Sequence, residues 1–137
     1  IKNMKIIKAA GILIKDRKLL LYKGKDKDTF VAPGGKLKGA ETPEAALARE
    51  LKEELNIGIS VDDLAMFGTF SAEAATNPGE TVVMTVFVVK AWRGQIKANE
   101  VGSEIFLVTS SVPPEIKVGS IFAHEVLPRL KASGLVD

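Results

Sequence analysis

Cysteine is absent from the 137-residue sequence, and no segment has the composition of a secretory signal peptide. Without thiols the chain can form no disulfide bond and can carry out no thiol chemistry. Such a composition fits a reducing compartment. We therefore expect a cytoplasmic protein.

Long apolar runs and excess charge are also lacking. No apolar run approaches the ~20 residues that a membrane-spanning helix needs. The 19 basic and 17 acidic residues leave a net charge of +2, which is too small to argue for a nucleic-acid or membrane surface. We therefore expect neither nucleic acid nor membrane as a partner. Since there is no internal repeat, we expect residues 1–137 to form a single domain with its own core.

Apolar segments separated by turn residues predict an α/β protein with a mixed sheet. Two helices are expected, one starting at Pro43 and one over Ile121–Ala132, where Pro128 requires either a later start or a kink. Turns are expected at Asp16-Arg17, at Pro33-Gly34-Gly35 and within Ala72–Glu80. The longest strand, Thr81–Trp92, is expected to be buried on both faces. The other predicted strands are Lys5–Ile14, Lys18–Tyr22, Met66–Ser71 and Glu104–Val108, and Phe30–Ala32 is expected to be a short extended run before Pro33.

The first helix has the clearest sequence signals. Thr42 is a good N-cap, and Pro43 suits the first helical position, where no N–H is needed. Leucine recurs at every fourth position from Leu47 to Leu55, which makes one apolar stripe. Asn56 suits a left-handed C-terminal cap.

Three glutamates share a neighbouring face of this helix. Glu50, Glu53 and Glu54 are spaced i, i+3 and i+4, where like charges repel one another. Arg49 can relieve Glu53 at i+4, but one cation does not balance three anions. Two interpretations follow: a solvated acidic face, or a site for Mg²⁺ or Mn²⁺, which prefer hard oxygen ligands.

The spacing around these glutamates resembles the Nudix box, G-x5-E-x7-R-E-U-x-E-E-x-G-U, where U is a bulky aliphatic residue. Gly35 and Glu41 stand at the first two positions, and Arg49–Ile57 supplies the rest. Asn56 replaces the last glycine of the pattern, a mild change for a residue that caps the helix. The chain is thus similar to Nudix hydrolases of the MutT type.

The resemblance implies an α/β/α sandwich and hydrolysis of a nucleoside diphosphate linked to another group, with Mg²⁺ or Mn²⁺ as cofactor. It implies that Glu50, Glu53 and Glu54 are metal ligands, joined by the backbone carbonyl of Gly35. Arg49 would orient the glutamates, and Glu50 is our first choice for the general base. Glu41 would brace the loop.

Further site residues are expected outside the box. The family often takes another carboxylate from a loop after the long central strand, for which Glu104 is the first candidate and Glu100 the second; each is equally well explained as an exposed loop acid. Lys23 is a candidate phosphate contact, or a solvated lysine. His124 lies roughly where MutT-type enzymes place a side chain that reads the base, although a lone surface histidine is the commoner case.

The substrate is inferred by elimination. Subgroups acting on ADP-ribose or dinucleoside polyphosphates carry a proline or a tyrosine beyond the box, where this chain has Ala72 and Ala74. A nucleoside triphosphate, standard or modified, is therefore the leading small-molecule substrate. A nucleoside diphosphate sugar such as ADP-ribose, and a non-catalytic nucleotide sensor, are the alternatives. A homodimer, in which a second copy of the chain completes a larger site, is a further possibility.

Overall fold

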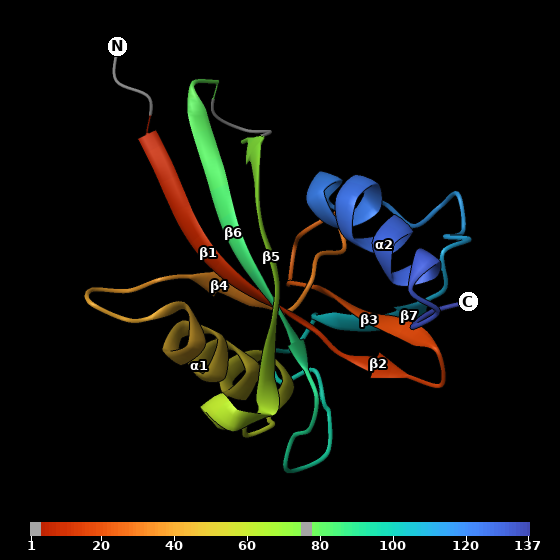
Figure 1. The fold of residues 1–137 in the computed structure, drawn as a ribbon, viewed down its shortest axis with the longest axis horizontal. Coiled ribbons are helices and arrows are strands. Elements are labelled where there is room, and N and C mark those ends of the chain that lie inside the picture. The colour runs from red at the N-terminus through yellow and green to blue at the C-terminus, as the bar shows by residue number, and fades with distance from the viewer. Residues whose placement is uncertain (1–3, 75–77) are drawn as a thin grey trace.

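The computed structural model describes residues 4–74 and 78–137. Two helical layers lie on opposite sides of a layer of strands, which is the expected α/β/α arrangement (Figure 1). Within the described residues, no helix is both long and apolar enough to cross a membrane.

The larger sheet has four strands in the order β4–β1–β6–β5. Its central pair, β1 and β6, is parallel, whereas β4 pairs with β1 and β5 pairs with β6 in antiparallel fashion. The sheet is therefore mixed, as the sequence predicted. Its strands are β1 (Met4–Ile12), β4 (Gly34–Lys36), β5 (Leu64–Glu73) and β6 (Glu80–Val89).

A smaller antiparallel sheet continues from the end of β1. It contains β2 (Ile14–Lys15), β3 (Lys18–Lys23) and β7 (Glu104–Val108). The predicted strand Lys5–Ile14 is thus two strands that belong to different sheets. The hairpin turn is confirmed: Asp16 and Arg17 have φ values of 52° and 62°, the left-handed geometry that a two-residue hairpin loop requires.

Successive side chains along the strands point to two separate cores. On β3, for example, Leu19 and Leu21 belong to one cluster, whereas Leu20 and Tyr22 belong to the other. The first cluster lies under the C-terminal helix and the second under the first helix. A continuous apolar run is needed here because a strand in the middle layer has no solvent face.

Helix α1 (Pro43–Leu55) matches its sequence signals closely. The amide of Ala45 donates to the Thr42 hydroxyl at 3.1 Å, and Asn56 adopts the left-handed conformation with φ 60°. The leucines of the apolar stripe, including Leu51, are fully buried against the sheet. This packing leaves the glutamate face of the helix turned away from the core.

Two predicted features need correction around the sheet. Gly34 and Gly35 do not form a turn but lie in β4, where a Cβ on Gly34 would collide with the backbone oxygen of Ala9 on β1. Glycine here permits close strand approach rather than chain reversal. The predicted turn in Ala72–Glu80 is only partly described: β5 continues to Glu73, residues 75–77 lie outside the described part, and Pro78 and Gly79 form a turn.

Strand β6 is shorter and less buried than expected. It ends at Val89 rather than Trp92, because the next amide, Lys90 N–H, bonds to the Asp63 carbonyl of the short 3₁₀ turn Val61–Asp63. Its first half is only half-buried, and full burial starts at Val86. The prediction of burial on both faces is therefore wrong for the first half of the strand.

The C-terminal helical segment accommodates Pro128 through a change of helical pitch. A π-helical turn over Phe122–Val126 precedes α2 (Leu127–Ala132). The Leu127 amide bonds to the Phe122 carbonyl, five residues back. A wider turn just before Pro128 removes the need for the N–H that proline lacks. The two predicted alternatives were a later helix start and a kink; the structure instead has a π-helical turn before α2.

Candidate active site

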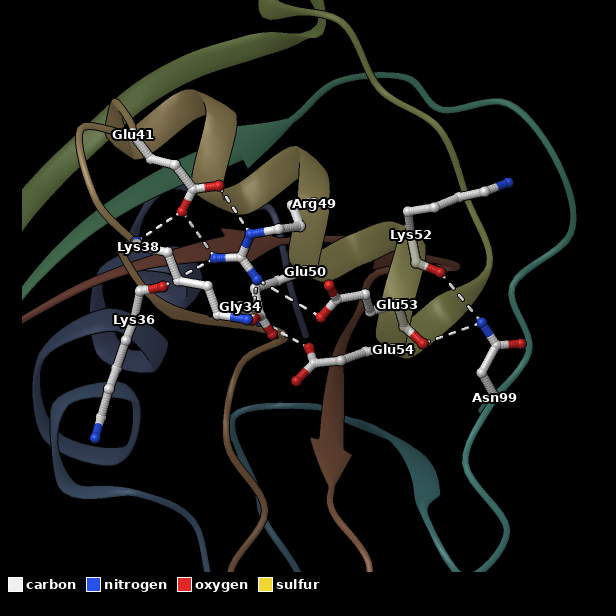
Figure 2. A network of polar contacts seen from close by, with 10 residues as sticks. All are labelled: Gly34, Lys36, Lys38, Glu41, Arg49, Glu50, Lys52, Glu53, Glu54 and Asn99. Carbon is white, nitrogen blue, oxygen red and sulfur yellow. Dashed lines mark hydrogen bonds and ion pairs between the residues drawn. The ribbon is translucent and has the colours of Figure 1, made fainter.

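Arg49 is the centre of a polar network between α1, the loop before it and β4 (Figure 2). Its guanidinium donates to both carboxylate oxygens of Glu41, at 2.8 and 2.9 Å, and to Glu50 Oε1 at 2.7 Å. It also donates to the backbone oxygen of Lys36 at 3.0 Å. The arginine therefore ties the loop before the helix to the helix itself and fixes the orientation of Glu50.

Strand β4 approaches the glutamates through its two glycines. The Gly34 amide donates to Glu54 Oε1 at 2.9 Å. A Cβ on Gly35 would lie 2.6 Å from the carboxyl carbon of Glu50, a separation that real side chains do not show. The Glu50 carboxylate thus occupies the space that a side chain at position 35 would need, which explains why this position of the box requires glycine.

Burial and neighbouring charges change the pKa values of this cluster. Burial is the main cause that raises the pKa of Glu54 to about 8, and repulsion from Glu50 and Glu53 adds to it. The bond from Arg49 lowers the pKa of Glu41 to about 2, and the two carboxylates in turn raise the pKa of Arg49. A cation bound beside such a carboxyl group would stabilise its charged form.

The oxygen atoms of this cluster are chemically suited to bind a hard divalent cation. Three carboxylates and the Gly35 carbonyl are oxygen ligands of the kind that Mg²⁺ and Mn²⁺ prefer. Among the described residues, however, no three acidic or histidine side chains are grouped closely enough to enclose an ion as they stand. Glu53 is 54% exposed and meets Arg49 only at 3.6 Å. It is the side chain with the most freedom to turn toward an ion.

A loop between β6 and β7 is fastened to the last turn of α1. The side-chain amide of Asn99 donates to the Lys52 and Glu53 carbonyls at 3.1 and 3.0 Å, and its backbone amide donates to the Glu54 carbonyl at 3.1 Å. Asn99 therefore satisfies the Glu53 and Glu54 carbonyls, which the helix end leaves open, and adds a second bond to the Lys52 carbonyl, which also accepts the Asn56 amide. The residue that follows it is Glu100, whose backbone this anchor holds near the last turn of α1.

Tyr22, on β3, contacts the same loop. Its hydroxyl bonds to Ser103, and the charges of Glu54, Glu100 and Glu50 all raise its pKa, after burial as the largest cause. Of the two candidates for an additional carboxylate, Glu100 is the one whose charge acts on Tyr22 together with the charges of Glu50 and Glu54.

Glu104 and Lys23 lie opposite each other and pair. They are partners in the β3–β7 register, and the Lys23 ammonium lies 2.7 Å from Glu104 Oε2. Lys23 also lies 5.4 Å from the centre of the Phe30 ring. The roles predicted for these residues, in metal binding and phosphate contact, stay predictions; a ligand would compete with their ion pair.

A cavity of about 230 Å³ lies between the larger sheet and the start of the C-terminal helical segment. Its walls are mainly apolar, from Val31, Ala72, Val82, Met84, Ile121 and Phe122, and its polar side chains are Lys8, Glu73 and Ser120. His124 does not line this cavity and is exposed on the helix surface. A larger hollow of about 580 Å³, beside Pro113 and Pro128, has no acidic side chain in its lining.

Sequence reasoning did not anticipate Lys8, Gly34 or Asn99 at the site. Asn99 and Lys8 lie far from the box in sequence, so only the fold brings them to it. Gly34 directly precedes the box, whose first residue is Gly35, and the box pattern itself does not include Gly34. Lys8 is one of two lysines in a strand that is otherwise apolar, and this was the one available hint.

A profile of the NUDIX domain family matches residues 5–127. The chain therefore belongs to the Nudix family and is a Nudix hydrolase. Its similarity to individual relatives points to the MutT-like branch of that family. A MutT-like protein of Streptomyces ambofaciens is 30% identical over 131 residues, which cover 93% of this chain and 79% of the relative.

Two further relatives carry different names. An 8-oxo-dGTP diphosphatase of Haemophilus influenzae is 34% identical over 112 residues, with 77% of this chain and 78% of the relative covered. An ADP-ribose pyrophosphatase of Methanocaldococcus jannaschii is 36% identical over 97 residues, with 69% of this chain and 56% of the relative covered. The relatives thus divide between two substrate classes.

Solved structures agree on the fold. The E. coli ORF135 protein superimposes with a TM-score of 0.74 at 21% identity, covering 98% of this chain and 96% of that one. A MutT NUDIX hydrolase from Burkholderia pseudomallei has a TM-score of 0.68 at 22% identity, covering 81% and 88%. A bifunctional NMN adenylyltransferase/ADP ribose pyrophosphatase from Francisella tularensis, complexed with AMP and a Mn ion, has a TM-score of 0.58 at 20% identity, covering 96% and 42%.

Proposed function

We propose that this Nudix hydrolase is a divalent-metal-dependent pyrophosphohydrolase of a nucleoside triphosphate, standard or modified. The observation that carries the proposal is the cluster of three glutamates held around Arg49 and Gly34, in a chain that also has an apolar cavity of about 230 Å³ with Lys8 in its wall. This volume is below the usual range for pockets that enclose a drug-sized ligand, so it suits one base rather than two nucleosides. The named 8-oxo-dGTP diphosphatase relative supports the same substrate class.

The glutamates supply the ligands in this proposal, and Arg49 keeps them in place. A bound Mg²⁺ or Mn²⁺ would neutralise the diphosphate and lower the pKa of a water molecule. Glu50 Oε1 is held by Arg49, which leaves Oε2 of the same carboxylate to accept a proton from the attacking water. Gly35 provides the room for that carboxylate, and the Gly34 amide orients Glu54.

The alternative substrate class is a nucleoside diphosphate sugar such as ADP-ribose. The ADP-ribose pyrophosphatase among the relatives favours it. Two observations favour the triphosphate. The chain has Ala72 and Ala74 where the other subgroups carry a proline or a tyrosine, and its cavity is small. A sensor without catalytic activity would bind nucleotide and show no turnover.

A substrate panel decides between these classes. We would measure kcat/KM for the common nucleoside triphosphates, 8-oxo-dGTP and ADP-ribose with Mg²⁺, reading phosphate and pyrophosphate separately. We expect one triphosphate to be preferred, with release of pyrophosphate and no activity in EDTA. A strong preference for ADP-ribose would overturn the substrate, and binding without turnover of any compound would indicate a sensor.

A further inference from the structure

Two lysines face each other across the edge of the larger sheet. Lys8 on β1 and Lys36 on β4 are direct partners in the antiparallel register, so their side chains leave the sheet on the same face. Like charges directly opposite each other destabilise a strand pair. Within the described part of the chain, neither ammonium forms a salt bridge. A bound anion would explain this arrangement.

Lys8 also belongs to the wall of the cavity described above. It is half-buried there, among side chains that are otherwise largely apolar. Burial lowers the pKa of its ammonium, and repulsion from Lys36 and then Lys27 lowers it further, whereas Glu54 raises it. Lys8 lies two residues along β1 from Ala10, the strand partner of Gly34, whose amide bonds to Glu54. Lys8 therefore links the wall of the cavity to the strand that contacts the glutamates.

The order of these groups restricts what an anion here can be. A base in the cavity and a diphosphate at the glutamates must be joined by the ribose and the phosphate nearest to it. In this arrangement that phosphate passes Lys8 in the cavity wall and its strand partner Lys36. Lysine suits such a place, because its compact charge and three rotatable donors bind a phosphate without strict orientation.

We propose that Lys8, assisted by its strand partner Lys36, forms an anion subsite that binds the phosphate adjoining the nucleoside. The proposal rests on the proposed function for the placement of the base, and it makes Lys8 a residue that discriminates nucleotides from nucleosides. The subsite acts without metal, because its charge comes from the protein alone.

The test measures binding without catalysis. Calorimetry in EDTA would compare the four common nucleoside monophosphates with their unphosphorylated nucleosides, on wild type, Lys8→Met and Lys8→Arg. Lys18→Met, an exposed lysine at the start of β3, is the control for loss of one charge. We expect Lys8→Met to weaken the best monophosphate about ten-fold, the loss of one charged hydrogen bond, and to leave its nucleoside unchanged. Lys8→Arg and Lys18→Met should stay within about two-fold of wild type.

Different outcomes separate this inference from the proposed function. An equal loss of nucleoside and nucleotide binding in Lys8→Met, or no loss of either, would overturn the subsite even if wild type hydrolyses triphosphates. If Lys8→Met should fail to fold, Lys36→Met serves instead, since that side chain is exposed; monophosphate affinity unchanged in it would contradict the proposal. A selective loss of monophosphate binding supports the subsite even where the substrate panel shows no triphosphate turnover.

Discussion

Glu54 is the residue whose surroundings depart most from those of a solvated carboxylate. It accepts the Gly34 amide at 2.9 Å, yet burial and two neighbouring glutamates still raise its pKa from 4.5 to about 8. In the metal-free protein it therefore keeps its proton near neutral pH. A metal ion would have to displace that proton, so metal binding should strengthen as the pH rises toward 8.

This shift predicts how stability depends on pH without metal. Between pH 4.5 and about 8 the native protein holds a proton that the unfolded chain releases, so the contribution of Glu54 to the free energy of unfolding falls as the pH rises. The loss should be at most a few kcal/mol, and it should be absent in Glu54→Gln. Urea unfolding in EDTA at pH 5, 6, 7 and 8 measures it. Equal slopes for wild type and Glu54→Gln would show that the raised pKa is wrong.

Single residues also show how far the sequence alone could go. The spacing of Gly35, Glu41, Arg49 and the three glutamates predicted a cluster that the structure brings together. It could not show that Arg49 binds Glu41 with two hydrogen bonds, or that Lys8 lines a cavity, because these contacts depend on chain segments that only the fold brings together. His124 was placed by analogy, and its exposed position gives that role no support from geometry.

Among the elements, α1 was the most predictable because its signals are local. Its N-cap, its apolar stripe and its left-handed end are each decided within a turn of helix, and all are present. The π-helical turn before Pro128 was not predictable, because it depends on how the segment packs its Phe122 and Val126 into the core. Strand β6 was overextended for a similar reason: the bond from Lys90 to Asp63 is a long-range contact.

The attachment of the β6–β7 loop to α1 gives a prediction at this scale. Asn99→Ala removes two side-chain hydrogen bonds, to the Lys52 and Glu53 carbonyls, at the end of α1. We expect a loss of about 1–2 kcal/mol in unfolding free energy and a larger relative loss in Mn²⁺ affinity, because Glu100 loses its anchor. Chemical denaturation and a metal titration measure the two effects. Asn56→Gly, which keeps a left-handed cap, is the control and should retain Mn²⁺ affinity. An Asn99→Ala protein with wild-type stability and metal affinity would contradict this role of the loop.

In the whole molecule, each of the two cores packs under one helix and supports a different part of the proposed site. The core under α1 holds the glutamate face in position, whereas the core under the C-terminal helical segment adjoins the cavity. Lys8 and Gly34, on the central and edge strands, lie where these two regions meet. The proposed active site is thus assembled from both sides of the larger sheet.

The most direct test of the central claim is pyrophosphate release from the preferred nucleoside triphosphate with Mg²⁺, compared between wild type, Glu50→Gln and Glu44→Gln. Glu44 lies in the first turn of the same helix, where it lines a hollow with Thr42 and Ile59, so its replacement removes one helix charge away from the network around Arg49. We predict that Glu50→Gln lowers kcat at least about 100-fold with the fold intact, and that Glu44→Gln keeps near wild-type activity. Equal activity of Glu50→Gln and wild type would contradict the account, because the glutamate face of α1 would then not carry the hydrolysis.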